Sequence, residues 1–138
     1  MSLNTEERKA VVEFRLEKAQ RAYEQAYAVA DMGFWETIAN RLYYAAYNAV
    51  SALLIAYQHN AQSHNGVIHL FGLHFVKNGP FTPEDGRLYH QLFSMRLTGD
   101  YDDTYGLKKE DILPLIEPAR ELIKKVSELA IQHLNEYE

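Results

Sequence analysis

The chain has 138 residues, of which 47% are hydrophobic, a formal net charge of -5 and no cysteine. This length allows one globular domain to bury a sufficient core without a disulfide or a metal, and the lack of cysteine excludes a thiolate metal site and a cysteine nucleophile. The negative charge argues against broad, sequence-independent binding of nucleic acid, because that affinity depends on how many phosphates Lys and Arg neutralise, so any such contact must be local.

The first ten residues include Glu6 and Glu7, whereas a signal peptide needs an apolar run at this place. No uninterrupted apolar stretch of the sequence approaches the roughly 20 residues that a membrane-spanning helix needs. We therefore expect a soluble, cytoplasmic protein.

Helical periodicity runs through the first half of the chain. Thr5 is a candidate N-cap followed by acidic residues, and apolar residues then recur at three- and four-residue spacing. The pattern predicts one helix over residues 6–31 and, after Gly33, a second over residues 34–58. The second half of this second helix is apolar nearly all round and rich in alanine, so we expect it to be the central, most buried helix.

The second half of the chain predicts three further helices. Ser63 can cap a helix over residues 64–77, which ends at the breaker "NGP", and a Thr-Pro pair begins another over residues 83–96. The last helix is predicted over residues 109–137. Its first third should be kinked or broken, because Pro114 and Pro118 each remove a backbone donor.

No strand-type alternation or internal repeat occurs in the sequence. The chain is therefore predicted to be a single all-α domain over residues 1–138, an up-and-down bundle of about five helices. Each predicted helix should contribute to the hydrophobic core, which we expect to include Phe14, Leu42, Ala45, Ala46, Ala49, Leu53, Ile68, Phe71, Leu92, Phe93, Leu122, Val126 and Leu129.

A charged side chain interrupts the apolar sequence of the second predicted helix. Arg41, Tyr44 and Asn48 share one stripe at positions i, i+3 and i+7, with Asn40 at its edge. One interpretation is that Arg41 lies near the helix start, extends to water and pairs with a carboxylate. The other is that Arg41 and Tyr44 point into a cleft and hold an anion such as a phosphate, because guanidinium is a planar and permanently charged donor.

Four of the six histidines, His59, His64, His69 and His74, are spaced by five residues. This spacing walks around a helix and does not stack side chains on one face, so we expect no metal site. No glycine-rich phosphate loop is recognisable, and we expect no cofactor. His64 differs from the others because it lies at the predicted start of the third helix, where backbone N–H groups are free.

The sequence "SMRLTGDYDDTYG" runs from the end of the fourth predicted helix into the segment before the last one. It contains an arginine, carboxylates and two tyrosines, whereas a plain connection needs only a turn. Arg96 falls at the predicted C-terminal end of the fourth helix, and Gly99 is expected to turn the chain back toward the second helix. Asp100 can orient a guanidinium through charge-assisted hydrogen bonds, while Tyr101 presents a hydroxyl. We therefore predict a site in this segment.

Three motifs occur in order along the chain: "NRLYYAAYNAVSALL", "SHNGVIHLFGLHFVKNG" and "LFSMRLTGDYDD". Together with the long last helix they resemble the HEPN superfamily, in particular its small single-domain bacterial and archaeal branch, over about residues 8–135. The resemblance implies a helical bundle that commonly dimerises and is often encoded beside a minimal nucleotidyltransferase as a toxin-antitoxin-like pair. Paired HEPN proteins are similar in carrying a modifiable tyrosine just after the arginine motif, which makes Tyr101 and Tyr105 the modification candidates.

Active HEPN ribonucleases use an Arg-x(4–6)-His motif, in which the arginine contacts the phosphate and the histidine transfers a proton at the ribose 2′-hydroxyl. By this resemblance the arginine is Arg96, but no histidine follows it before His133. Tyr101 stands at the spacing of the missing histidine, and a tyrosine with an ordinary pKa of about 10 is a poor general base at neutral pH.

The sequence leaves three functions open. In the leading one, the protein is a nucleotide- or RNA-binding module that works with a minimal nucleotidyltransferase, and a homodimer brings two copies of its arginines together. The alternative is a metal-independent endoribonuclease toxin with an altered motif, whose catalytic candidates are Arg96, Tyr101 and His64. The third is a purely structural interaction protein. For the leading function, the predicted binding residues are Arg41, Tyr44, His64, Arg96, Asp100 and Tyr101.

Overall fold

The computed structural model describes residues 3–101 and 106–137, with the side chains of residues 3–99 and 106–136. This part of the chain is helical and contains no strand, which confirms the predicted all-α class. Its α-helices are α1 (Thr5–Ala28), α2 (Trp35–Ala56), α3 (His64–Phe71), α4 (Pro83–Tyr101), α5 (Lys109–Ile112) and α6 (Ile116–Tyr137). Shorter helical turns follow three of them, a 3₁₀ turn at Ala30–Met32, a π-helical turn at Gly72–Lys77 and a 3₁₀ turn at Leu113–Leu115.

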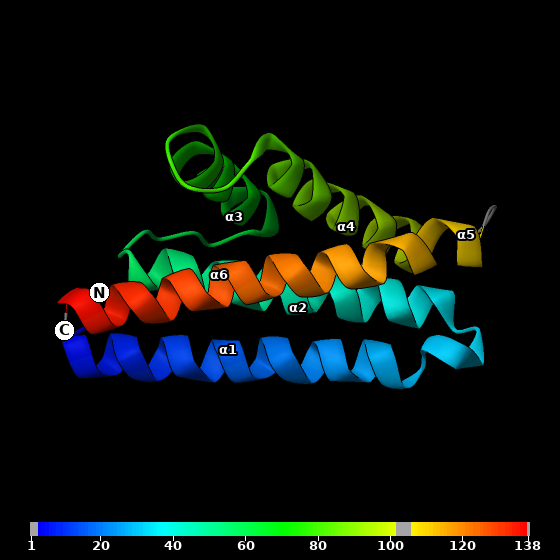
Figure 1. The fold of residues 1–138 in the computed structure, drawn as a ribbon, viewed down its shortest axis with the longest axis horizontal. Helices are drawn as coiled ribbons and strands as arrows, with labels where there is room; N and C mark the ends of the chain where they lie inside the picture. The colour runs from blue at the N-terminus through cyan, green and yellow to red at the C-terminus, as the bar shows by residue number, and fades with distance from the viewer. Residues whose placement is uncertain (1–2, 102–105, 138) are drawn as a thin grey trace.

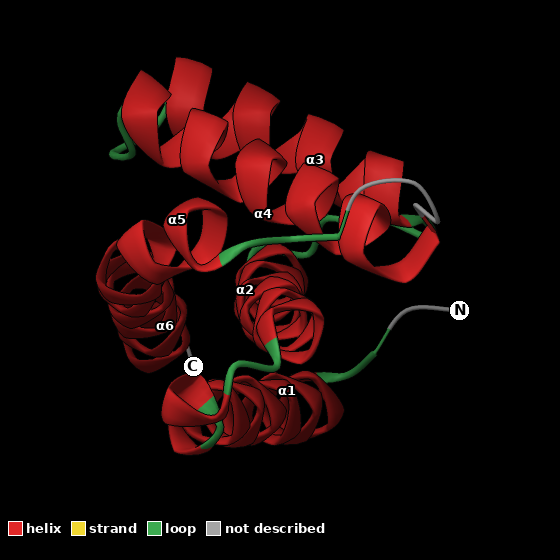
Figure 2. Cartoon of the chain, turned by 90° about the vertical axis from the view of Figure 1, so that its right-hand side faces the viewer, coloured by secondary structure: helices red, strands yellow, loops and turns green. Residues whose placement is uncertain are grey.

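The helices are arranged around α2. Figure 1 shows α1, α2 and α6 lying side by side along the length of the molecule, with α3 and α4 covering one side of this group. In the end view of Figure 2, α2 lies in the middle, with α1 below it, α6 to one side, and α3 and α4 above. The prediction that the second helix is central is confirmed.

The small side chains of α2 explain this central position. Between Asn48 and Ala56 every residue except Ile55 is buried. Alanines at Ala49 and Ala52 are fully buried and let neighbouring helices approach closely. The apolar sequence of this half of α2 therefore reflects burial on all sides.

Most of the predicted core residues lie in the core. The buried ones are Leu42, Ala45, Ala46, Ala49, Leu53, Phe71, Leu92, Leu122 and Val126. Ile68, Phe93 and Leu129 are half-buried and pack against the core. The prediction for Phe14 is wrong, since its side chain is 60% exposed. Phe14 is two residues past the buried Val12, about 200° around the helix, and the Lys18 ammonium lies 5.6 Å from its ring centroid.

The ends of α1 differ slightly from the prediction. Asn4, and not Thr5, is the N-cap: its side-chain oxygen accepts from the backbone N–H of Glu7 at 2.8 Å, and its own N–H donates to the Glu7 carboxylate at 2.9 Å. This reciprocal pair is a capping box. At the other end, Gly33 adopts a φ of 78°, a conformation that glycine takes without steric cost and that reverses the chain into α2.

The largest departure from prediction is the length of α4, which continues to Tyr101 instead of ending at residue 96. Gly99 therefore lies within a helix and makes no turn. A Cβ atom at Gly99 would lie 3.0 Å from Leu107 Cδ1 and 3.5 Å from the Cα of Glu36 in the first turn of α2. This glycine thus permits close approach of α4 to α2, and Arg96 lies one turn inside the helix.

The expected break in the last helix is confirmed. Pro114 lies in the 3₁₀ turn that separates α5 from α6, and Pro118 lies in the first turn of α6. A proline in a first turn costs no intrahelical hydrogen bond, because the N–H groups there have no acceptor within the helix. None of the helices in the described ranges is long and apolar enough to cross a membrane.

The start of α4 is fixed against α6. Asp85 accepts a hydrogen bond from the backbone N–H of Thr82 at 3.0 Å and pairs with Lys125 Nζ of α6 at 2.7 Å. Burial acts to raise the pKa of Asp85, but the bonds from Lys125 and Thr82 outweigh it and lower that pKa. These contacts hold the first turn of α4 against α6.

Candidate functional site

Three tyrosines on α2 form the centre of an aromatic cluster. Tyr43, Tyr44 and Tyr47 share one side of the helix, and their ring centroids are 5.2 to 6.1 Å apart. Phe93 of α4 packs with its centroid 5.5 Å from that of Tyr43. Tyr43 is fully buried and its ring stacks on that of Tyr89 at 6.2 Å, so the cluster continues the core toward the surface.

Arg96 joins this cluster from α4. Its Nη2 donates a hydrogen bond to the Tyr44 hydroxyl oxygen at 3.0 Å. Its guanidinium carbon lies 5.4 Å from the Tyr44 ring centroid and 5.8 Å from that of Tyr43, within the range of a cation–π contact. Arg96 is half-buried, so its charge lies over the rings in a partly dry environment.

His64 joins the same cluster from the first turn of α3. Ser63 caps this helix by accepting from the backbone N–H of Gly66 at 2.9 Å, which places the histidine ring against α2. The His64 Nδ1 lies 2.5 Å from the Tyr43 hydroxyl, and its ring centroid lies 4.6 Å from that of Tyr47.

The protonation states of this pair follow from their surroundings. Burial raises the pKa of Tyr43, so its hydroxyl keeps its proton at pH 7. Burial, followed by the nearby charge of Arg96, lowers the pKa of His64, so the imidazole is neutral. We assign the shared hydrogen bond as Tyr43 O–H donating to His64 Nδ1, which leaves the proton of the imidazole on Nε2.

Arg41 lies on the other side of Tyr44. Its Nε and Nη2 donate to the side-chain oxygen of Asn40 at 3.0 and 2.7 Å, and its Nη1 donates to the side-chain oxygen of Gln25 at 3.1 Å. Its guanidinium carbon lies 5.5 Å from the Tyr44 ring centroid. Among the described side chains Arg41 pairs with no carboxylate, so within this part of the chain the pairing expected by the first interpretation is wrong. The charge of Arg41 is held by neutral amides and is not cancelled by them.

The structure thus brings together four of the predicted site residues. These are Arg41, Tyr44, His64 and Arg96, and with Tyr43, Tyr47 and Phe93 they are called the Arg96 cluster below. Asn48, from the same stripe as Arg41, is buried instead and donates to the Tyr44 backbone carbonyl at 2.9 Å.

Three predicted residues fall outside what the structure describes. Asp100 and Tyr101 continue the backbone of α4, but their side chains lie outside the described residues, as does Tyr105 altogether. The predicted turn that would carry Asp100 and Tyr101 back toward α2 is wrong, because α4 is helical through both positions.

The residues that the sequence analysis missed are Tyr43, Tyr47 and Phe93. The adjacent tyrosines Tyr43 and Tyr44, followed by a third at helical spacing, were the available signal. The sequence stripe was drawn through Arg41, and Tyr43 lies about 200° around the helix from Arg41, so Tyr43 was left out. Tyrosine is large enough for its hydroxyl to reach residues that its Cβ does not face.

The arrangement has the chemistry of an anion site. It combines guanidinium groups with neutral donors, the Tyr44 hydroxyl and the Nε2–H of His64, on a largely apolar floor. No group of three or more potential metal ligands occurs among the described residues.

The class of protein follows from a comparison of the whole chain. The HEPN domain family model matches residues 12–129, and the protein belongs to this family, which confirms the resemblance stated above. A UPF0332 protein of Thermotoga maritima is 29% identical over 123 residues, which cover 89% of this chain and 93% of the relative. A Methanocaldococcus jannaschii protein named "Putative toxin MJ0142" is 28% identical over 123 residues, which cover 89% of this chain and 84% of the relative.

A second protein of the same organism, named "Putative toxin MJ0605", is 38% identical over 61 residues, which cover 44% of this chain and 46% of the relative. The residues matched by the HEPN model include every member of the Arg96 cluster.

Proposed function

We propose that the Arg96 cluster binds a phosphate group of RNA or of a nucleotide, and that this HEPN protein is the binding component of a toxin-antitoxin-like pair with a minimal nucleotidyltransferase. The observation that carries the proposal is the hydrogen bond from Arg96 to Tyr44, with His64 in the same aromatic cluster. Three helices supply these groups, so the site depends on the fold. The names of the two Methanocaldococcus relatives support a toxin-like role.

The hydrogen-bond directions suit a phosphate. The Tyr44 oxygen accepts from Arg96, and a hydroxyl that accepts one hydrogen bond can still donate another through its O–H to a phosphate oxygen. The Nε2–H of His64 is a second neutral donor, and Arg96 supplies the charge that makes the hydrogen bonds strong. A chain of net charge -5 would in this way bind an anion through one local group of donors.

A homodimer is part of the proposal. Two copies of Arg41 and Arg96 at one interface would bring positive charge together, and repulsion between them would be relieved by a bound phosphate chain. A monomer measured by light scattering at tens of micromolar protein would contradict this part. Phosphate binding by a single chain is tested separately with labelled RNA.

A second candidate function is endoribonuclease activity, which the position of His64 favours. His64 lies in the cluster with Arg96, so it is placed to replace the motif histidine that the sequence lacks. As a general base its Nε2 would have to be unprotonated, which requires the other tautomer, with Nδ1–H donating to the Tyr43 oxygen. With the tautomer assigned above, Nε2–H is a hydrogen-bond donor to the phosphate, as the leading proposal requires.

The test uses a fluorescently labelled single-stranded RNA and measures both binding and cleavage. Arg96→Ala should weaken binding at least tenfold. Arg87→Ala is the matched control, since Arg87 lies on the same helix but is exposed and pairs with Glu84 at 2.8 Å. Equal affinities of the two variants would overturn the proposal. Cleavage by the wild type that is lost in both Arg96→Ala and His64→Gln would establish the ribonuclease instead.

A further inference from the structure

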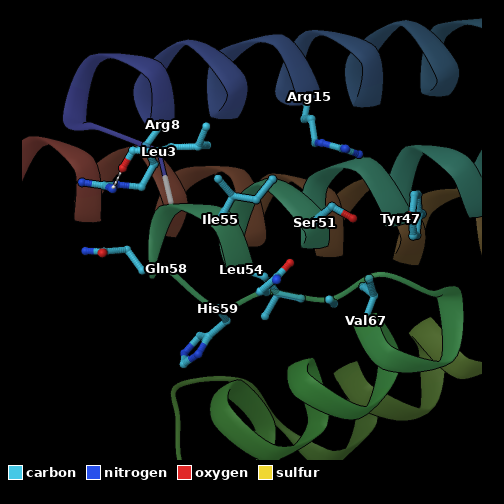
Figure 3. Close-up of a pocket in the computed structure, with 12 residues that line it drawn as sticks. Leu3, Arg8, Arg15, Tyr47, Ser51, Leu54, Ile55, Gln58, His59 and Val67 are labelled. Atoms are coloured by element: carbon cyan, nitrogen blue, oxygen red, sulfur yellow. Dashed lines mark hydrogen bonds between the residues drawn. The ribbon is translucent and has the colours of Figure 1, made fainter. Parts of the chain in front are cut away.

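A pocket with Tyr47 in its lining lies apart from Arg96, which does not line it. It has a volume of about 540 Å³ and is bounded by α1, by the second half of α2 and by the connection that leads to α3 (Figure 3). This volume falls within the range of about 300–1,000 Å³ that is typical of small-molecule sites. Tyr47 is the only residue of the Arg96 cluster among the described residues that line it.

Arg15 points into this pocket from α1. Figure 3 shows its guanidinium reaching toward the part of α2 where Ser51 and Tyr47 lie. Arg15 is half-buried and forms no hydrogen bond or ion pair with any residue in the described ranges. A guanidinium held partly out of water without a partner is a ready binding group for an anion.

Ser51 provides a second, independent indication of a ligand. Its side chain is only 6% exposed and lines the same pocket. Its hydroxyl oxygen is buried and has no hydrogen-bond partner within the described part of the chain. Buried hydroxyls are normally satisfied, and a serine in a helix can bond to a carbonyl of the preceding turn, which Ser51 does not do.

The remaining walls define what else the ligand must contain. Leu54, Ile55 and Val67 supply an apolar surface, and no Asp or Glu is among the described residues that line the pocket. Arg8 lies two turns before Arg15 on α1 and adds a second positive charge. Burial and the neighbouring His74 lower the pKa of His59 at the rim, so at pH 7 the charge of the pocket belongs to the arginines.

We infer that this pocket binds a small organic anion, with its phosphate or carboxylate group on Arg15 and Ser51 and its apolar body against Leu54 and Val67. The phosphate and the carboxylate share this chemistry, and the experiment distinguishes them. The site is separate from the Arg96 cluster, and the inference does not depend on the function proposed for that cluster.

The test is calorimetric titration of the full-length protein with phenyl phosphate, benzoate, adenosine monophosphate and inorganic phosphate. We expect saturable binding of at least one organic anion, with inorganic phosphate at least tenfold weaker because it lacks an apolar body. Binding of phenyl phosphate in preference to benzoate would assign a phosphate head group, and the reverse preference a carboxylate. No saturation by any organic anion at up to about 5 mM would overturn the inference.

Variants locate the binding. Arg15→Gln and Ser51→Ala should each weaken it at least fivefold, whereas the matched control Arg21→Gln, an exposed arginine of the same helix, should not. Ser51→Ala removes a buried unsatisfied hydroxyl, so the unliganded variant should fold at least as stably as the wild type. Equal affinities of Arg15→Gln and Arg21→Gln, or loss of binding in Arg96→Ala, would overturn the assignment to this pocket.

Discussion

The two halves of α2 make different contributions to the molecule. From Asn48 to Ala56 the helix is built of small and aliphatic residues and is buried on nearly every side. The half that precedes it carries Arg41 and three tyrosines, and contacts His64 and Arg96 through polar groups. One helix thus supplies both the centre of the core and the floor of the candidate site. We conclude that changes in the later half should alter stability, while changes at the half-buried Arg41 and Tyr44 of the earlier half should alter ligand binding more than stability.

Truncation in the later half should have the largest effect. Leu53 is fully buried, and Leu53→Ala should lower the free energy of unfolding by about 2–5 kcal/mol, because transfer energy is lost and a cavity remains. Urea denaturation measures this change. Phe14→Ala is the control, since that side chain is 60% exposed and its truncation should stay within about 0.5 kcal/mol. A loss below about 1 kcal/mol for Leu53→Ala would mean that this half of α2 is not the core.

Acidification should lower the free energy of unfolding through two histidines, His64 in the Arg96 cluster and His59 at the rim of the Arg15 pocket. The pKa values of His64 and His59 are lowered by burial, with Arg96 and His74 as further causes. Below the unfolded pKa of about 6.5 the unfolded state binds more protons, so the free energy of unfolding should fall as the pH drops from 7 to 5.

Denaturation measured across this pH range checks the effect. His64→Gln should flatten the dependence, because it removes one of the two histidines whose pKa is lowered by burial. Identical slopes in wild type and His64→Gln would show that His64 is not desolvated by the cluster.

The hydrogen bond between Arg96 and Tyr44 should contribute less than the core. Tyr44→Phe removes the acceptor, and because both side chains are half-buried we expect a loss of about 1 kcal/mol in the free energy of unfolding. Tyr27→Phe, at a tyrosine that is 65% exposed, is the matched control and should be near neutral. A loss in Tyr44→Phe as large as in Leu53→Ala would erase the proposed division between the two halves of α2.

The smallest effect is expected just past the end of α2. Gln58 adopts a φ of 64°, which is strained for a residue with a Cβ. Gln58→Gly should relieve this strain and stabilise the protein by about 0.5 kcal/mol after the added entropy of the unfolded chain is subtracted. Asn60→Gly has no such strain to relieve and should destabilise, and thermal denaturation of the two variants compares them directly.

The fold was largely predictable because its signals are local. Periodicity located α1 and the apolar face of α2, and the prolines located the break before α6. The extension of α4 was missed because Gly99 has the local character of a helix breaker, whereas its role depends on the approach of Glu36 and Leu107, which are distant in sequence. The burial of Phe14 was mispredicted because an aromatic residue on α1 does not reveal which face the partner helices cover.

The candidate site was predictable only in part. Arg41, Tyr44, His64 and Arg96 were named from the sequence, and they meet in the structure. Their arrangement was not predicted correctly, because Arg96 was expected at a helix end next to a turn and lies inside α4. The Arg15 pocket gave no sequence signal at all, because an arginine on a polar helix is ordinary until a buried serine is found across from it.

The central claim is that the earlier half of α2 and Arg96 form a phosphate site, and the salt dependence of RNA affinity tests it most directly. Fluorescence anisotropy should be recorded for wild type, Arg96→Ala and Arg87→Ala over a range of salt concentrations. The account predicts that Arg96→Ala binds RNA more weakly than wild type. The slope of log affinity against log salt concentration should also fall in magnitude by about 0.7, which corresponds to one phosphate contact on a single strand. Arg87→Ala should behave like wild type in both respects. A wild type that binds no RNA, or an Arg96→Ala variant with the same affinity and slope as Arg87→Ala, would contradict it.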